Sequence, residues 1–138
     1  MTYLLDTTVL LYAAGDPTHP LKRPAVEIVR RVAAGAVRAT ATLEILQEFM
    51  HVRAHRRTRE DAAVWVERYA ALLSPLVVVG EATMLRAAHE FARRPTIGAF
   101  DTVLVALVLE ADDIELVTAD RALLDLDDVP TVDLATFV

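Results

Sequence analysis

The sequence predicts a three-layer α/β/α domain with a central parallel sheet of four to five strands. Short apolar runs of strand length alternate with longer segments in which apolar residues recur at helical spacing. Such alternation is typical of a parallel sheet that is covered by helices on both faces and linked by right-handed crossovers. The chain has 138 residues, 54% of them hydrophobic, which suffices for one buried core. We therefore expect a single domain over residues 1–138.

The first part of the chain supplies two expected strands and three helices. Thr7 or Thr8 can cap the first helix, and the turn Gly15-Asp16-Pro17 stops it. Gly35 provides the left-handed residue that closes the second helix. The elements expected here are strands at 2–5 and 37–41 and helices at 7–14, 21–34 and 43–56.

The second part continues the alternation. One helix begins at Thr58 and ends before Ser74-Pro75, and Arg93-Arg94-Pro95 marks the end of the next, before a loop over 96–100. The helix that Asp101 opens is apolar nearly all round, so we expect it to be buried. The elements expected here are helices at 58–73, 81–93, 101–111 and 119–124 and strands at 76–79, 114–118 and 131–132, the last at a sheet edge.

Composition excludes several classes of protein. The chain has no Cys, so neither disulfides nor a thiolate metal site can contribute. No basic segment precedes an apolar stretch at the N-terminus, which argues against a signal peptide. The longest apolar run, 103–109, is too short to span a bilayer. We expect a soluble cytoplasmic protein without a membrane partner.

The charge is unevenly distributed. A net charge of −6 taken alone discourages nucleic-acid binding, but residues 51–59 carry four arginines and no acid. Such a basic run would suit the phosphates of an anionic substrate, or the carboxylates of a partner protein. The alternative is a solvated helix end, where cations favour the helix dipole. The arginines are Arg53, Arg56, Arg57 and Arg59.

Acidic residues stand where expected strands end and helices begin. Asp6 follows the first strand, Asp120 lies two residues past the strand 114–118, and Asp101 opens the apolar helix. Glu44 and Glu48 lie one turn apart on a largely apolar helix. The carboxyl ends of parallel strands border the usual ligand crevice, and acids brought together there repel each other unless a cation lies between them. The pattern predicts an acidic pocket for a divalent cation.

Each acid also has a purely structural interpretation. Asp6, Asp101 and Asp120 can each be the N-cap of the helix that follows, a common role for Asp. Glu44 and Glu48 can form a solvated helix face, although the apolar neighbours leave little such face. The convergence of four acids on connections that meet at one sheet edge favours the site.

Four segments, in order, resemble the motifs of PIN-domain ribonucleases, most closely the VapC-type toxins of bacterial toxin–antitoxin pairs. They are Tyr3-Leu4-Leu5-Asp6-Thr7-Thr8-Val9-Leu10, residues 44–49 from Glu44 to Phe49, residues 100–106 from Phe100 to Ala106, and Leu116-Val117-Thr118-Ala119-Asp120-Arg121. The resemblance covers nearly the whole chain.

The resemblance implies a metal-dependent endoribonuclease that uses Mg²⁺ or Mn²⁺. Its acids would be Asp6, Glu48, Asp101 and Asp120, with Glu48 favoured over Glu44 because the small hydroxyl residue Thr42 stands six residues before it. Thr8 stands where many members have Asn or Ser. The implied partners are an RNA substrate, a second copy of the chain in a homodimer, and a cognate antitoxin that fills the groove.

The chemistry is consistent with the residues themselves. Phosphodiester hydrolysis needs a nucleophilic water and stabilisation of charge on the phosphate, and carboxylate-held Mg²⁺ can provide both. The four histidines are scattered, and we expect surface or RNA-facing positions for them. Trp65 and Tyr69, at helical spacing, favour the core or a partner over base stacking.

Other interpretations lead to different classes of protein. A phospho-acceptor signalling domain needs a Lys after its last core strand, and the only Lys is Lys22. A non-catalytic PIN-like binding module would have lost acids that this chain keeps, and a structure-specific DNA nuclease would keep the same set. Whether an outer acid is added by Asp125, Asp127 or Asp128 is left open by their spacing.

Overall fold

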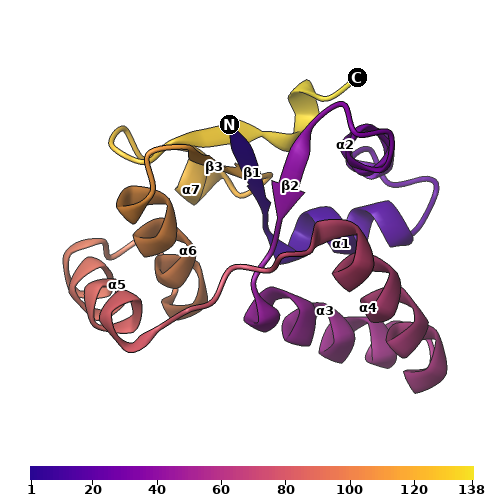
Figure 1. Ribbon diagram of the computed structural model, residues 1–138, viewed down its shortest axis with the longest axis horizontal. Helices are drawn as coiled ribbons and strands as arrows, with labels where there is room; N and C mark the ends of the chain where they lie inside the picture. Colours follow the sequence, from indigo (N-terminus) through magenta and orange to yellow (C-terminus); the bar gives the residue numbers. More distant parts are fainter.

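Four parallel strands form the central sheet of the computed structural model, which describes all residues from 1 to 138. The strand order is β2-β1-β3-β4, so the two innermost strands come from opposite ends of the chain (Figure 1). Leu4 of β1 pairs with Thr40 on one side and with Leu116 on the other. The predicted α/β class is confirmed, with the strands β1 Thr2–Leu5, β2 Arg38–Thr40, β3 Ile114–Thr118 and β4 Thr131–Asp133.

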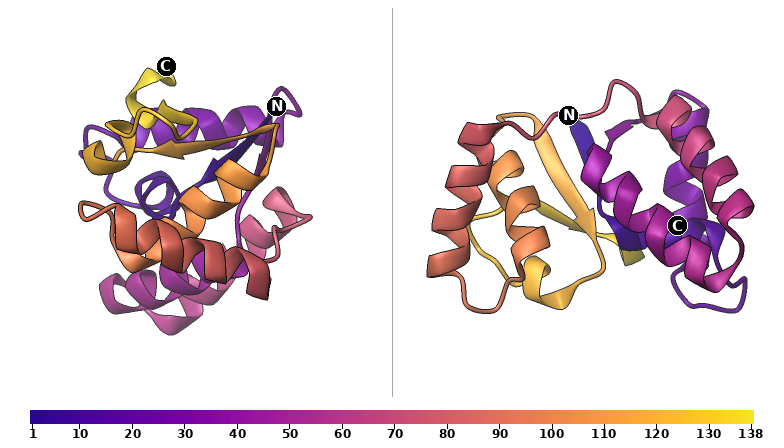
Figure 2. Two further views of the ribbon diagram at one scale, coloured as in Figure 1. Left: turned by 90° about the vertical axis from the view of Figure 1, so that its left-hand side faces the viewer. Right: turned by 90° about the horizontal axis from the view of Figure 1, so that it is seen from below.

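Helices stand on both sides of these strands. The pair α5 and α6 lies on one side, and the pair α3 and α4 lies on the other with α1 (Figures 1 and 2). No helix is both long enough and apolar enough to cross a membrane. The helices are α1 Thr7–Ala14, α2 Lys22–Ala33, α3 Leu43–Arg56, α4 Arg59–Leu73, α5 Glu81–Arg93, α6 Ala99–Glu110 and α7 Arg121–Leu124, followed by a 3₁₀ turn, η1, Leu134–Thr136.

The core lies between the central strands and the helices. Leu4, Leu5, Leu116 and Val117 of the two inner strands are fully buried. Helix α6 buries residues 104–108 in succession, as predicted from a helix that is apolar nearly all round. This burial fixes α6, and with it the acid in its first turn, against the carboxyl end of the sheet.

Aromatic residues of α3 and α4 complete the core on the other side. Tyr69 is buried against Phe49, and its hydroxyl donates to the carbonyl oxygen of Leu10 at 2.8 Å. Trp65 packs at the edge of this cluster, where the guanidinium of Arg53 lies 5.8 Å from its ring centroid. The interpretation of Trp65 and Tyr69 as core residues rather than base-stacking ones is consistent with these contacts.

Local capping explains where most helices begin. The hydroxyl of Thr42 accepts from the backbone N–H of Ile45 at the start of α3, and the hydroxyl of Thr58 does the same for Asp61 in α4. Gly35 follows α2 with φ of 74°, the left-handed conformation expected for it.

One predicted strand is absent, and two predicted helices begin two residues away from the expected position; α7 begins at Arg121 rather than at 119. Residues 76–79 do not form a strand, since the segment makes only one bridge, between Thr42 and Val77, and Val78 is 79% exposed. It is an apolar connection that touches the sheet edge once as it runs from α4 to α5. Helix α6 begins at Ala99 after Gly98, two residues earlier than expected, so residues 99 and 100 are helical rather than part of a loop.

Candidate active site

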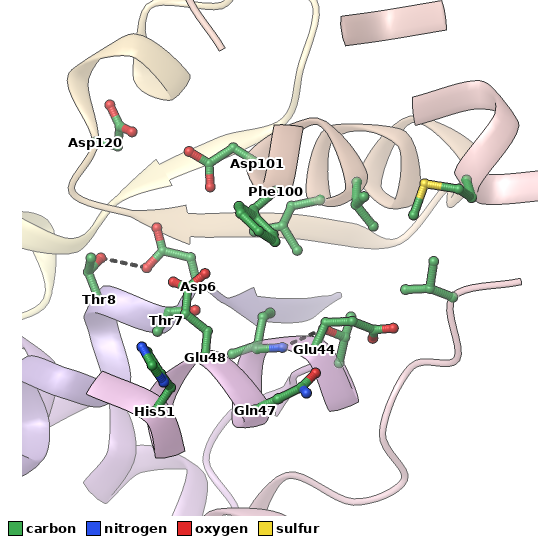
Figure 3. Close-up of a pocket in the computed structure, with 16 residues that line it drawn as sticks. Asp6, Thr7, Thr8, Glu44, Gln47, Glu48, His51, Phe100, Asp101 and Asp120 are labelled. Carbon is green, nitrogen blue, oxygen red and sulfur yellow. Dashed lines mark hydrogen bonds between the residues drawn. The ribbon is translucent and has the colours of Figure 1, made fainter. Parts of the chain in front are cut away.

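A cavity of about 640 Å³ opens at the carboxyl end of the sheet, between α3 and α6 (Figure 3). The inner strands β1 and β3 meet here at the point where the strand order changes direction, which is the usual place for a ligand in an open α/β sheet. No Lys or Arg is among the sixteen lining residues. Five lining residues are acids: Asp6, Glu44, Glu48, Asp101 and Asp120.

Asp6 is held in place from three directions. It follows β1 directly and is only 5% exposed. One carboxylate oxygen accepts from the Thr8 hydroxyl at 2.7 Å and from the N–H of Val9 at 3.2 Å, so Asp6 also caps α1. The other accepts from the Thr118 hydroxyl at 2.5 Å. Burial raises the pKa of Asp6, and these hydrogen bonds oppose the rise by favouring the charged form.

The Thr118 hydroxyl links the two ends of the chain. Besides donating to Asp6, it accepts from the N–H of Asp120 at 3.0 Å. The Asp120 carboxylate accepts from the N–H of Ala122 at 2.9 Å and caps α7. Asp6 and Asp120 are therefore both helix caps and lining residues of the cavity, so the structural interpretation of each is correct without excluding a role in a site.

Asp101 does not cap a helix. It is the third residue of α6, and the capping position is occupied by Gly98. Its half-buried carboxyl points into the cavity between Asp6 and Asp120 (Figure 3). Burial, followed by the negative charges of Asp6, Asp120 and Glu48, raises the pKa of Asp101 to about 6. The acids that the sequence places far apart thus lie close enough to repel one another.

The two glutamates of α3 point in different directions. Glu48 points toward Asp6, whereas Glu44, in the first turn, points toward the opposite end of the cavity (Figure 3). Glu48 is one of the charges that raise the pKa of Asp101, and Glu44 is not. This geometry agrees with the preference for Glu48 as the acid of this helix.

The acids suit a hydrated divalent ion better than a fully coordinated one. No three acidic or histidine side chains come close enough to bind one ion directly. Mg²⁺ keeps several of its waters and takes only one or two carboxylates, so a looser acidic ring fits it. Uncompensated carboxylates in a shared cavity also need a cation to offset their repulsion. The donor set is therefore compatible with Mg²⁺ or Mn²⁺.

The four arginines of the basic run occupy two different environments. Arg53 is buried; it donates to both carboxylate oxygens of Asp61, at 2.5 and 3.3 Å, and to the carbonyl oxygen of Ala14 at 3.0 Å. This clamp joins α3, α4 and the end of α1. The other three, Arg56, Arg57 and Arg59, are exposed around the end of α3. None of the four lines the cavity, and Arg56 lies eight residues, or about 12 Å along the helix, beyond Glu48.

Several features of the cavity were not found in the sequence. His51, one turn beyond Glu48, lines it, with its ring centroid 4.5 Å from that of His55. Asp128 is committed elsewhere, because it pairs with Arg94 at 2.6 Å, and neither it nor its acidic neighbours line the cavity. The amide of Gln47 and a group of apolar side chains complete the lining: Ile45, Val79, Met84, Phe100, Val103 and Leu104. The only feature of the sequence that could have indicated this apolar lining was the aromatic residue directly before Asp101.

Comparison with known proteins extends over nearly the whole chain. The family model described as PIN domain matches residues 3–129. The chain is 43% identical over 130 residues to Ribonuclease VapC7 of Mycobacterium tuberculosis, an alignment that covers 91% of this chain and 87% of that protein. The crystal structure of VapBC2 from Rickettsia felis bound to a DNA fragment from their promoter has the same fold. It matches with a TM-score of 0.71 and 14% identity over 96% of this chain and 98% of that one.

Proposed function

The chain belongs to the PIN-domain family and, within it, to the VapC-type proteins, and on that premise we propose that it is a metal-dependent endoribonuclease. It would hydrolyse RNA phosphodiester bonds with Mg²⁺ or Mn²⁺ and act as the toxin of a toxin–antitoxin pair. One observation carries the proposal, which is a cavity lined by five acids without a single Lys or Arg. The 43% identity to a protein named a ribonuclease supports RNA as the substrate.

Four of the five acids would bind the metal ion. Asp6, Glu48, Asp101 and Asp120 would bind it, directly or through its waters. The chemistry that such an ion supplies is a lowered pKa of water and neutralisation of charge on the phosphate oxygens. The Thr8 and Thr118 hydroxyls orient both oxygens of Asp6 before anything binds. A ligand that is already fixed loses less entropy on binding.

Asp101 makes the site responsive to pH. Because its pKa is about 6, a fraction of the free protein carries a proton on this carboxyl near neutrality. A cation must displace that proton, so metal affinity rises with pH through this range. Glu44, at the other end of the cavity, contributes negative charge and is the secondary acid of α3.

The exposed arginines serve the RNA phosphates in this proposal. Arg56, Arg57 and Arg59 have solvent-facing guanidinium groups at the end of α3, and phosphate contacts of this kind hold RNA without selecting its sequence. Arg53 was predicted to act with them, but its donors are occupied by Asp61 and Ala14, so its role here is structural. The same three arginines would face carboxylates of the cognate antitoxin, and the toxin would form a homodimer, as the family resemblance implies.

The test is to incubate the purified protein with total RNA in chelator, in Mg²⁺ and in Mn²⁺, and to map new 5′ ends. Cleavage at defined sites only when metal is present supports the proposal, and Asp101→Asn serves as the inactive control. Single-stranded and structured DNA are assayed in parallel. Binding of RNA without cleavage in any metal would instead indicate a non-catalytic module, and preferential cleavage of DNA would indicate a DNA nuclease.

A further inference from the structure

One wall of the cavity is apolar, although the hydrolysis itself needs only charges and water. Figure 3 shows four of the five acids gathered toward one end of the cavity, with Phe100 between them and the end where Glu44 lies. The other apolar lining residues include Val79 and Met84, which come from the connection before α5 and from α5 itself. The volume of about 640 Å³ exceeds what a hydrated ion requires, since six waters occupy about 180 Å³. Space is left for a further group.

Phe100 is the most exposed aromatic side chain of this wall. Its side chain is 80% exposed, and Met84, which also lines the cavity, is 51% exposed. Aromatic side chains bury 150–250 Å² of surface when covered, and a cavity lined by apolar and aromatic side chains with a few polar groups is typical of a ligand site. Phe100 is the second residue of α6, whose following residues are buried, so its backbone is fixed. The Phe100 ring is therefore an exposed apolar surface on a fixed backbone, and no other part of the protein covers it.

The opposite wall of the cavity, on α3, is mostly polar, with Ile45 as its one apolar residue. Gln47 of α3 faces the cavity across from Phe100 (Figure 3). Its amide offers both a donor and an acceptor, which a base edge can match and a lipid or an aliphatic side chain cannot. The subsite thus combines a platform for a flat apolar face with an amide that can bind a polar edge.

We infer that Phe100, with Met84 and Val79 in the same cavity and Gln47 on its α3 side, binds the nucleobase of the nucleotide next to the scissile phosphate. The inference rests on the proposed function and names the part of the substrate that selects the cleavage site. Single-stranded RNA is recognised in this way, by stacking of unpaired bases on aromatic rings and by hydrogen bonds to their edges. The substrate would be an unpaired segment of RNA.

The position of the ring explains why a base is the occupant. Phe100 directly precedes Asp101 in the chain, so their Cα atoms are 3.8 Å apart. A phosphate that reaches the acids therefore brings its neighbouring nucleosides to the ring, because each phosphate carries a nucleoside on both sides. Stacking is tolerant of sequence, whereas the Gln47 amide pairs best with adenine, through the N6 and N7 positions. The subsite as a whole favours a purine.

The test measures stacking and cleavage separately. RNA oligonucleotides carry the fluorescent base 2-aminopurine on either side of the mapped cleavage site, and binding is followed in Ca²⁺. Wild-type protein quenches this fluorescence at one of the two positions. Phe100→Ala removes the quenching and weakens RNA binding about 5- to 150-fold, the equivalent of the 1–3 kcal/mol that stacking contributes. Phe100→Tyr retains both, and the matched control is Phe91→Ala, a half-exposed phenylalanine of α5 outside the cavity.

Cleavage assays in Mn²⁺ add a second readout. Phe100→Ala is expected to raise KM for the oligonucleotide. With an RNA that is abasic at the quenched position, wild type and Phe100→Ala are expected to have the same KM. Gln47→Ala is expected to leave stacking intact and to reduce the preference among the four bases at that position. Because Phe100 is largely exposed, the Phe100 variants should have the same melting temperature as the wild type, which thermal unfolding verifies.

The outcomes distinguish this inference from the proposed function. Quenching in Ca²⁺ without cleavage in any metal would support the base subsite and contradict the ribonuclease. Cleavage by Phe100→Ala with wild-type KM and no quenching by the wild type would overturn the base subsite and leave the ribonuclease intact. Wild-type RNA binding by Phe100→Ala together with loss of dimerisation in sedimentation would assign Phe100 to a protein interface and also overturn the inference.

Discussion

Replacing Asp101 by Asn should stabilise the metal-free protein, because it removes a carboxylate whose ionisation is disfavoured by burial and by the neighbouring acids. The pKa of Asp101 is raised from 3.8 to about 6, a shift of about two pKa units. At 1.36 kcal/mol per unit this corresponds to a penalty of about 3 kcal/mol for ionising Asp101 in the folded state. The side chain is partly exposed and therefore screened, which reduces the expected effect to about 1–2 kcal/mol. For a chain of this length the melting temperature should rise by about 3–8 °C.

The sign of the effect depends on pH. A carboxyl whose pKa is raised on folding destabilises the protein where it is ionised, above about pH 6. The penalty disappears as the pH falls toward the unfolded value of 3.8. Asp101→Asn should therefore exceed the wild type in stability most at pH 7–8 and match it below about pH 4. Asp112→Asn, at an exposed acid outside the cavity, is the control and should show no comparable gain.

Divalent metal should reverse this ranking. An ion present at a hundred times its dissociation constant stabilises the wild type by about 2.7 kcal/mol, and the variant forfeits most of this. The assay is thermal or urea unfolding of both proteins in chelator and in Mn²⁺ from pH 4 to pH 8. An Asn variant that is less stable than the wild type at pH 7.5 in chelator would refute the argument that burial and the neighbouring acids make ionised Asp101 unfavourable in the folded protein.

Three further predictions follow from the site and its surroundings. Glu48→Gln should be nearly inactive at all Mg²⁺ concentrations, whereas Glu44→Gln should keep activity that rises with added metal; the reverse order in metal titrations would transfer the role to Glu44. Mn²⁺ affinity measured by calorimetry should fall as the pH drops below about 6, by at most about tenfold per pH unit for one displaced proton; a pH-independent affinity would contradict the role of Asp101. Replacing Arg56 and Arg57 by Ala should lower the salt slope of RNA binding by about 1.4, while Arg53→Ala should instead cost about 2–3 kcal/mol of stability in urea unfolding; unchanged stability of Arg53→Ala would be inconsistent with the clamp.

The inner strands and the acids beside them could be predicted because local sequence dictates them. The strand 114–118, buried over its last three residues, has ends that coincide with those expected. Asp6 and Asp120 then follow from one rule, that parallel strands bring their carboxyl ends to the same edge. What the rule could not supply was the link between them, the Thr118 hydroxyl, since a hydrogen bond across 112 residues has no local signature.

Segments whose burial depends on distant partners were harder to predict. Residues 76–79 have the composition of a strand, but only one backbone bridge is available where they pass the sheet. A short apolar run does not distinguish a strand from a buried connection. Ala99 and Phe100 were expected in a loop for the opposite reason, since nothing in their sequence shows that the apolar helix after them extends two residues further back.

The environments of the four arginines in residues 51–59 could not be predicted from the sequence either. All four arginines look alike in the sequence, yet Arg53 faces inward on α3 and finds Asp61 on the next helix. A buried arginine is tolerated only with such a partner, and the partner is chosen by helix packing. For a similar reason the apolar wall around Phe100 could not be predicted, because it is assembled from separate elements.

In the proposed function, RNA cleavage requires a divalent ion held by these carboxylates. The most direct measurement is the initial rate of cleavage of one defined RNA by metal-stripped protein as Mn²⁺ is titrated, with Asp6→Asn measured alongside. We predict no cleavage in chelator, saturable restoration by Mn²⁺ in the wild type, and no restoration in the variant over the same range. Cleavage in chelator at the rate seen in saturating Mn²⁺ would contradict this requirement for metal.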